Sequence, residues 1–229
     1  MPADTREHAA IQAPLSGLNH NGKCHELCIV LFSDDVLFFQ RILRADGLYE
    51  GNLDGQWGPK TERAAKEFEK LAEEIRPRAG TFDIRSERSL STLCLKAQNE
   101  ARLFPCRVVG DGLNVRIISG TRIYAEQNAL YKKGRFGNRG PVVTNARGGF
   151  SNHNFGIARD IGIFTPSGGY KADGPEYEKA AQKGLSPEIE WGGNWKKLVD
   201  KSHYQLRQHF QIAELRARFE EGNPFILPA

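Results

Sequence analysis

The chain has 229 residues, of which 39% are hydrophobic, and it carries a formal net charge of +4. This length fits either one large domain or two small ones. The four cysteines do not form the pattern of a disulfide framework, and no internal repeat or low-complexity segment is visible. Composition therefore excludes a disulfide-stapled scaffold and a repeat protein.

The N-terminal stretch has no apolar run in residues 1–12, so we expect neither a Sec-type signal peptide nor membrane insertion. Synthesis in the cytoplasm without an export signal follows from this expectation. Cys24, His25 and Cys28 lie close together and could bind a second, structural zinc ion. Because no matching Cys/His pair lies nearby, buried or unreactive thiols are the favoured interpretation.

Two amphipathic helices are predicted in the first third of the chain. The first has a stripe at helical spacing made of Val36, Phe39, Gln40 and Leu43. A dense run of turn residues follows at 47–55. The second helix should begin with Thr61 as its N-cap and bury a stripe made of Ala64, Ala65, Phe68, Leu71, Ala72 and Ile75.

A domain boundary is expected where Pro77 and Gly80 end the second helix. The linker would lie at 76–81, between a helical domain of residues 1–80 and a second domain of residues 81–229. A third helix near Ser86 is predicted to open the second domain, with one apolar face made of Leu90, Leu93, Cys94, Ala97 and Ala101.

Charge is distributed unevenly between these two parts. Residues 1–80 contain 10 lysines and arginines against 13 acidic residues, whereas residues 81–229 contain 22 against 15. A basic second part favours encounter with an anionic polymer, and salt weakens that attraction. The basic cluster at 132–135 is short and no nucleic-acid-binding motif accompanies it, so we expect no nucleic acid partner.

Two short segments supply histidines and carboxylates at defined spacings. They are residues 151–160, with the sequence SNHNFGIARD, and residues 200–203, with the sequence DKSH. Two imidazoles and one carboxylate can bind zinc and leave one position for water, while the second carboxylate moves the proton of that water. A single His–Asp pair is more often a surface feature. The two segments together predict a catalytic zinc site.

The local sequence predicts how these residues meet. β-branched and aromatic residues follow Asp160, which predicts a strand with this carboxylate near its start. His153 would lie on the preceding loop, where Gly156 lets the backbone turn. A second short strand is predicted at 203–206, and alternation places its first residue, a histidine, on the same face as Gln205.

The order of motifs resembles a known family. The pattern Ser-x-His-x-x-Gly-x-Ala-x-Asp precedes Glu-Trp-Gly-Gly-Asn-Trp at 190–195 and then Asp-x-x-His. Together these resemble the zinc peptidases of bacterial cell walls, the D-alanyl-D-alanine carboxypeptidase and L-alanyl-D-glutamate endopeptidase group, which share a fold with hedgehog signalling domains. The resemblance covers about residues 85–229 and includes upstream matches at Ile117 to Arg122, Gln127, Leu130-Tyr131, Gly134-Arg135 and Val143 to Ala146.

This resemblance implies a role for each residue of the site. The zinc ligands would be His153, Asp160 and His203, and Asp200 would be the general acid/base. Arg122 would bind substrate and stabilise the developing oxyanion, since a fixed guanidinium donates paired hydrogen bonds and stays charged. In the implied mechanism a zinc-bound water attacks the peptide carbonyl, and Asp200 transfers its proton to the leaving amine.

Substrate contacts are predicted for Ser151, Gln127 and Trp191. Ser151 could instead cap its loop, and Trp191 could instead wall the site and pack against the sheet. Thr121 stands where the family often has a tyrosine. The shape of that subsite is therefore open.

The helical part resembles the three-helix peptidoglycan-binding domain. The matching patterns are Gln-x-x-Leu, Gly-x-Tyr-x-Gly, Asp-Gly-x-x-Gly and Thr-x-x-Ala-x-x-x-Phe, in that order. Trp57 stands where phenylalanine is common, and Glu69 replaces the usual glutamine. The resemblance implies binding to the wall, and the alternative is a helical appendage that packs on the second domain.

We therefore expect an α+β fold, with a small N-terminal helical bundle and a zinc peptidase domain built on an antiparallel sheet flanked by helices. The expected function is hydrolysis of the peptidoglycan stem peptide by an L-Ala-D-Glu endopeptidase, a bacteriolytic phage endolysin released to the wall through a holin. The alternatives are a D-Ala-D-Ala carboxypeptidase, a secreted interbacterial toxin of the same chemistry, and a non-catalytic zinc-containing wall-binding protein. The expected partner is peptidoglycan, and the expected state is a monomer.

Overall fold

The computed structural model describes residues 33–78, 82–108, 110 and 112–226. The possible second zinc site at Cys24, His25 and Cys28, and the stretch examined for a signal peptide, lie outside these residues. The elements in chain order are α1 (Ser33–Ala45), α2 (Pro59–Ile75), η1 (Arg76–Arg78), α3 (Ile84–Leu90), α4 (Leu95–Val108), β1 (Asn114–Ser119), α5 (Tyr124–Lys132), η3 (Asn152–Phe155), β2 (Ala158–Phe164), β3 (Tyr170–Lys171), α6 (Pro175–Gly184), β4 (Ile189–Trp191), η4 (Gly192–Asn194), β5 (His203–Leu206) and α7 (Ile212–Glu221).

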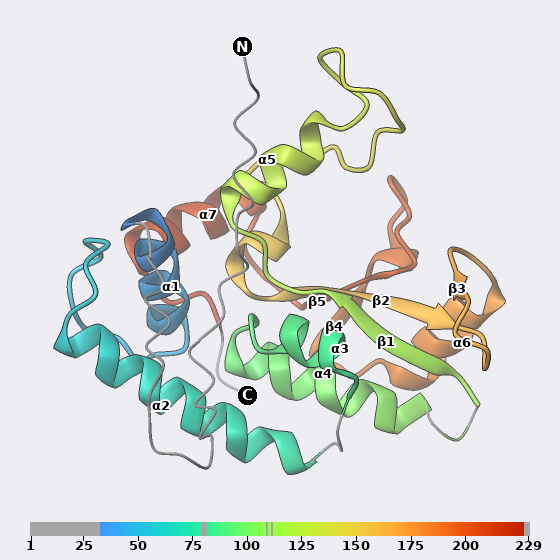
Figure 1. Ribbon diagram of the computed structural model, residues 1–229, viewed down its shortest axis with the longest axis horizontal. Coiled ribbons are helices and arrows are strands. Elements are labelled where there is room, and N and C mark those ends of the chain that lie inside the picture. The colour runs from blue at the N-terminus through green and yellow to red at the C-terminus, as the bar shows by residue number, and fades with distance from the viewer. Residues whose placement is uncertain (1–32, 79–81, 109, 111, 227–229) are drawn as a thin grey trace, which may run out of the picture.

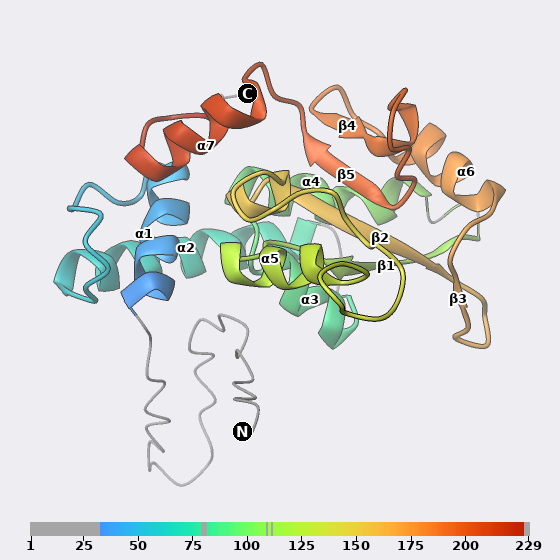
Figure 2. The ribbon, with the colours of Figure 1, turned by 90° about the horizontal axis from the view of Figure 1, so that it is seen from above.

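A mixed arrangement of helices around one antiparallel sheet confirms the predicted α+β fold. The strand order is β1-β2-β5-β4, and β3 pairs with β2. Figure 1 shows α3 and α4 below the sheet and α5 above it, and Figure 2 shows the same layers from above. In the part of the chain that the structure describes, no helix combines the length and apolar character that crossing a membrane requires.

Alternation along the strands assigns the two faces of the sheet. Arg159 on β2 and Tyr204 on β5 point toward α4, because both contact the ring of Phe104. Side chains of neighbouring strand residues point to opposite faces. Asp160 follows Arg159 by one position, and His203 precedes Tyr204 by one position. Asp160 and His203 pair with each other across β2 and β5, so they share the other face of the sheet.

The two predicted helices of the first part are present, with one correction at the start of α2. Thr61 is not the N-cap, because the helix begins at Pro59 after Gly58. Proline suits the first helical position, where its missing N–H would have no partner in any case. The Thr61 hydroxyl is buried inside the helix, 3.2 Å from the side-chain nitrogen of Gln40.

The single helix predicted near Ser86 is two helices, α3 and α4. The apolar face is buried as expected, but tertiary partners take the backbone groups at the break. The N–H of Cys94 donates to the carbonyl of Gly156, and the N–H of Leu95 donates to the carboxylate of Asp46. These contacts come from segments far away in sequence, so local periodicity could not predict the break.

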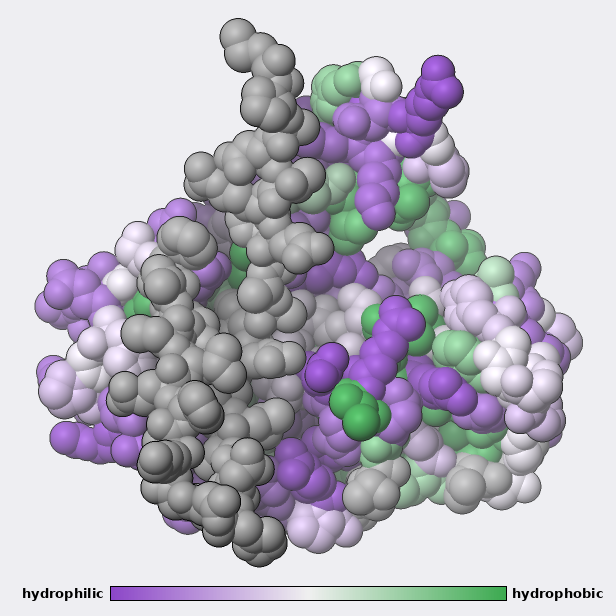
Figure 3. Space-filling view, in the orientation of Figure 1, coloured by the Kyte–Doolittle hydropathy of each residue, from purple (hydrophilic) through white to green (hydrophobic). Residues whose placement is uncertain are grey.

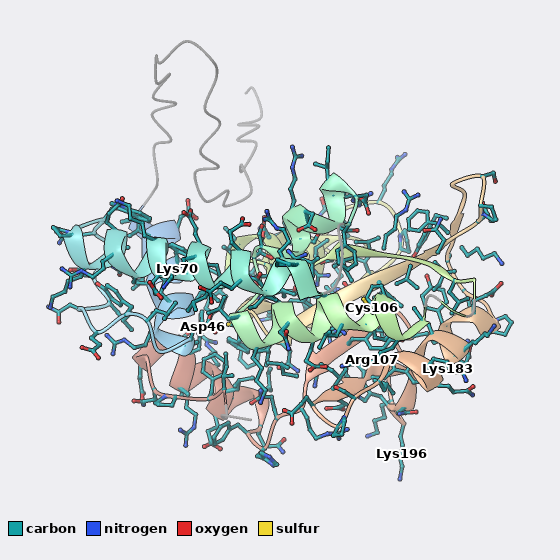
Figure 4. All side chains as sticks on the ribbon, turned by 90° about the horizontal axis from the view of Figure 1, so that it is seen from below. Asp46, Lys70, Cys106, Arg107, Lys183 and Lys196 are labelled. Carbon is teal, nitrogen blue, oxygen red and sulfur yellow. The ribbon has the colours of Figure 1, made fainter. Side chains whose placement is uncertain are left out.

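The two parts of the chain share one hydrophobic core. Phe38 of α1 makes edge contacts with Tyr124 of α5 and Phe219 of α7, at centroid distances of 6.3 and 5.5 Å. Asp46, labelled in Figure 4, caps the start of α4 from the end of α1. The helical part thus packs directly against the second part, and the division at residue 80 remains a prediction.

Candidate metal centre

Three predicted ligand residues converge on one point. His153 lies in η3, Asp160 near the start of β2 and His203 at the start of β5. Their ligand atoms lie within 4.8 Å of one another. Asp160 Oδ1 is 3.1 Å from His153 Nε2 and 3.4 Å from His203 Nδ1, and the two histidine nitrogens are 3.2 Å apart.

The backbone around His153 explains this placement. Gly156 ends η3 with φ of +71°, a left-handed conformation that glycine adopts without strain. A Cβ at this position would lie 2.6 Å from the sulfur of Cys94. The chain can therefore turn tightly against α4 and enter β2, which brings His153 beside Asp160.

The spacing of the three atoms fits a small tetrahedral cation. Zinc binds imidazole nitrogen and carboxylate oxygen at about 2.0 to 2.1 Å, so two ligand atoms of a tetrahedral site lie about 3.3 Å apart. The observed separations of 3.1, 3.2 and 3.4 Å agree with that value. With three protein ligands the site would keep one position open, as catalytic zinc sites do.

Hydrogen bonds on the outer sides of both imidazoles select the nitrogen that faces the site. Nδ1 of His153 lies 2.7 Å from the carbonyl oxygen of Gly120, which can only accept, so this nitrogen donates and Nε2 is free. Nε2 of His203 lies 2.9 Å from Oε1 of Gln205, which leaves Nδ1 free. Both free nitrogens face Asp160, which is the arrangement that metal ligation requires.

Charge in the cluster favours an ionised carboxylate and a neutral His153. Burial alone would raise the pKa of Asp160, but the charge and hydrogen bonding of His153, with further contributions from His203 and Arg122, hold that pKa well below its usual range. Burial lowers the pKa of His153. Burial also acts to lower the pKa of His203, yet the hydrogen bond and charge of Asp160 outweigh it and raise that pKa.

Arg122 lies against the metal-ligand cluster. Its Nη2 donates to Oδ2 of Asp160 at 2.5 Å and to Oγ of Ser119 at 2.8 Å, and its Nη1 lies 3.4 Å from Oε1 of Gln127. The guanidinium therefore holds the carboxylate oxygen that points away from the histidines. This contact was not predicted, and the contact of Arg122 with substrate stays a prediction.

Asp200 lies beside the cluster but does not belong to it. Its backbone carbonyl accepts from the N–H of His203, and its Oδ1 accepts from the N–H and hydroxyl of Ser202. The side chain is exposed, and its negative charge acts to raise the pKa of His203. This position would suit a group that exchanges protons beside a bound metal ion, and the general acid/base role of Asp200 stays a prediction.

Two of the predicted substrate contacts lie on buried side chains. Gln127 is completely buried, its amide donates to the carbonyl of Ala146 and its Oε1 lies near Arg122, and its contact with substrate stays a prediction. Trp191 is 8% exposed, and its indole N–H donates to the carbonyl of Lys201. It packs behind β5, which is the alternative that the sequence left open. Ser151 is partly exposed at the start of η3, and its contact with substrate stays a prediction.

Sequence reasoning did not predict the hydrogen bonds behind His203. Oε1 of Gln205 accepts from His203 and Asn152, while Nε2 of Gln205 donates to Glu190. The alternation of β5 had placed Gln205 on the correct face. Nothing in the spacing indicated that Glu190, on another strand, would accept a hydrogen bond from Gln205.

A loop projects from the molecule after α5. Figure 3 shows a gap between the body of the molecule and the loop that projects after α5. This loop exposes Phe136, Val142 and Val143. A separate pocket of about 180 Å³, lined in part by Lys96 and Glu188, contains none of the three ligand residues, so we attach no role in the metal chemistry to it.

Comparison with known proteins finds similarity to peptidases. Residues 144–206, which include all three ligand residues and Asp200, match the family described as D-alanyl-D-alanine carboxypeptidase. The chain is 38% identical over 106 residues to the peptidoglycan L-alanyl-D-glutamate endopeptidase CwlK of Bacillus subtilis (strain 168). That match covers 42% of this chain and 62% of the relative, so the chain matches less than two thirds of the relative's length.

A solved structure with similarity to this chain is that of the Serratia marcescens L-Ala D-Glu endopeptidase ChiX. It has a TM-score of 0.40 and 25% sequence identity, and the alignment covers 57% of this chain and 92% of that one. The family match and the CwlK match confirm the predicted resemblance to this peptidase family.

Proposed function

We propose that this chain is a zinc-dependent peptidoglycan hydrolase that cleaves the L-Ala-D-Glu bond of the stem peptide. The observation that carries the proposal is the cluster of His153, Asp160 and His203, whose spacing fits zinc with one open position. The endopeptidase specificity is supported by the 38% identity to CwlK over 106 residues.

The residues around the cluster suit hydrolysis of an amide. A zinc ion in this site would supply a Lewis acid and would lower the pKa of a water to about 7. The carboxylate of Asp200 would take a proton from the attacking water and deliver it to the leaving amine. Oδ1 of Asp200 is held by Ser202, so Oδ2 is the oxygen placed to exchange that proton.

A D-Ala-D-Ala carboxypeptidase is the second candidate, because the family that matches residues 144–206 bears that description. Both reactions use the same metal chemistry and differ in the bond that the substrate presents. Digestion of purified sacculi followed by mass spectrometry of the muropeptides separates them. New N-terminal D-glutamate supports the endopeptidase, and loss of terminal D-alanine supports the carboxypeptidase. If neither product forms with zinc-loaded protein, the enzymatic proposal is wrong and a wall-binding protein remains.

We also propose that the protein acts as a monomer on the bacterial wall, as an endolysin that lyses cells after release through a holin. The alternative is an interbacterial toxin delivered by a secretion machine. The basic second part of the chain supports attraction to an anionic wall polymer. Expression in a bacterial host with and without a holin tests this: lysis that depends on the holin supports the endolysin, and lysis without it contradicts that route.

A further inference from the structure

A hydrogen-bonded chain of three side chains connects His203 to Glu190. Oε1 of Gln205 lies 2.9 Å from Nε2 of His203, and Nε2 of Gln205 donates to Oε2 of Glu190 at 3.0 Å. The other oxygen of Glu190 accepts from the indole N–H of Trp195 at 2.6 Å. Asn152 donates a second hydrogen bond to Oε1 of Gln205. His203 and Gln205 are 6% and 5% exposed, so water has little access to replace these partners.

The hydrogen bonds that connect Glu190, Gln205 and His203 have a fixed direction from donor to acceptor. A carboxylate accepts hydrogen bonds and has no donor, so Glu190 must face the NH₂ group of Gln205. The carbonyl end of the same amide then faces His203. That carbonyl can only accept, so it selects the tautomer of His203 with its proton on Nε2 and its lone pair on Nδ1.

We propose that Glu190 is a positioning residue that sets the metal-binding tautomer of His203 through Gln205. This inference rests on the metal site of the proposed function and deepens it, but it does not depend on which peptide bond is cleaved. Both oxygens of Glu190 already accept hydrogen bonds from side chains, and Glu190 makes no direct contact with the ligand atoms. The residue therefore acts on the metal site through Gln205.

The two histidine ligands differ in how their tautomers are fixed. His153 donates to the backbone carbonyl of Gly120, which no substitution can reverse. His203 depends on an amide side chain, whose two ends have nearly the same shape and can exchange places. The orientation of the Gln205 amide is fixed only by a neighbour that accepts hydrogen bonds and donates none. Glu190 is that neighbour.

The first test changes which groups donate and which accept in this set of hydrogen bonds, without changing the shape of the side chains. In Glu190→Gln the new amide can keep its carbonyl toward Trp195, which places its NH₂ group against the NH₂ group of Gln205. Gln205 must then rotate and direct a donor at Nε2 of His203. We expect zinc affinity, measured by competition with a chelator, to fall by about 10- to 100-fold, the usual effect of losing an outer partner of a metal ligand.

The second test restores the original match of donors and acceptors in this set of hydrogen bonds. Glu190→Gln combined with Gln205→Glu exchanges the two side chains, keeps the net charge and restores every donor and acceptor in the chain. We expect the double variant to recover zinc affinity to within about threefold of the parent. Gln205→Glu alone places two carboxylates against each other and should bind zinc less tightly than the double variant.

Either of two results overturns the inference: unchanged zinc affinity in Glu190→Gln, or no recovery in the exchanged double variant. If Glu190→Gln does not fold, nitrogen-15 NMR of the zinc-loaded parent protein decides. A metal bound at Nδ1 of His203 with a slowly exchanging proton on Nε2 supports it, and a metal bound at Nε2 refutes it. These readouts measure metal binding, so failure of the proposed peptidase specificity would leave them unaffected.

Discussion

Arg122 and Asp160 form an ion pair in which Nη2 of the arginine lies 2.5 Å from Oδ2 of the carboxylate. The other oxygen, Oδ1, faces His153 and His203. The arginine thus pairs with the carboxylate of Asp160 on the side away from the histidines and leaves Oδ1 directed toward them. A guanidinium suits this task, because it can also bond to Ser119 while keeping its charge.

The pairing predicts the effect of Arg122→Lys. A lysine keeps the charge but loses the fork that holds Asp160 and Ser119 together, so we expect zinc affinity to fall by about 10-fold. Zinc titration of the metal-free protein measures this. Arg116→Lys serves as the control, since Arg116 lies over the ring of Phe164 and should leave affinity unchanged. Equal affinities of the parent and Arg122→Lys would contradict the assigned contact.

Loss of a ligand should remove the metal. His153→Ala or His203→Ala deletes one of only three protein bonds, and both variants should lose stoichiometric zinc together with lytic activity. Elemental analysis of the purified proteins checks this, with the exposed His209→Ala as the matched control. A variant that retains one zinc per chain and normal turnover would show that the ligand assignment is wrong.

Asp200→Asn should separate chemistry from metal binding. The amide preserves size and can still accept a hydrogen bond from Ser202, but it cannot take up a proton. We expect bound zinc to remain while turnover of a soluble muropeptide falls by about 100-fold or more. Asp173→Asn, at an exposed carboxylate paired with Lys201, is the control. Turnover near that of the parent would exclude Asp200 as the general acid/base.

Asp46 predicts an unusual dependence of stability on pH. Burial raises its pKa to about 7 from the ordinary value of 3.8, although the N–H of Leu95 acts to lower it. Between these two values the folded state binds more protons than the unfolded state, so this residue stabilises the fold most at low pH. Its contribution is lost as pH rises through about 7.

Asp46→Asn should therefore raise the free energy of unfolding by about 1–3 kcal/mol at pH 8 and change it little at pH 4. Denaturant titration at both pH values measures the difference, and the exposed Glu50→Gln is the control. An Asn variant that is destabilised equally at both pH values would refute this pH dependence.

Phe38 tests whether the helical part is an independent domain. Its ring contacts Tyr124 and Phe219, so Phe38→Ala should lower the free energy of unfolding by about 3–5 kcal/mol. One cooperative transition should shift as a whole. Phe39→Ala is the comparison, because Phe39 contacts Trp57 and Phe68 within the helical part. Two separate transitions, of which Phe38→Ala moves only one, would instead support independent domains.

Local sequence was sufficient to predict that His153, Asp160 and His203 lie together. Residue type limits what can bind zinc, and the spacing of His153 and Asp160 around Gly156 predicted a loop that leads into a strand. Alternation along β5 then placed His203 and Gln205 on the same face. These inferences succeeded because strand alternation and glycine conformation depend on neighbours in the chain.

The sequence by itself determined the chemistry of the site, meaning which side chains can bind a metal and which can move a proton. The tertiary structure alone decided which side chains are buried and which groups form hydrogen bonds with them. Gln127 and Trp191 are buried, Glu190 reaches His203 through Gln205, and Asp46 divides one predicted helix into α3 and α4. Each of these outcomes depends on a partner from a distant segment. Local pattern does not encode such partners, because burial and hydrogen bonding are settled only when the whole core packs.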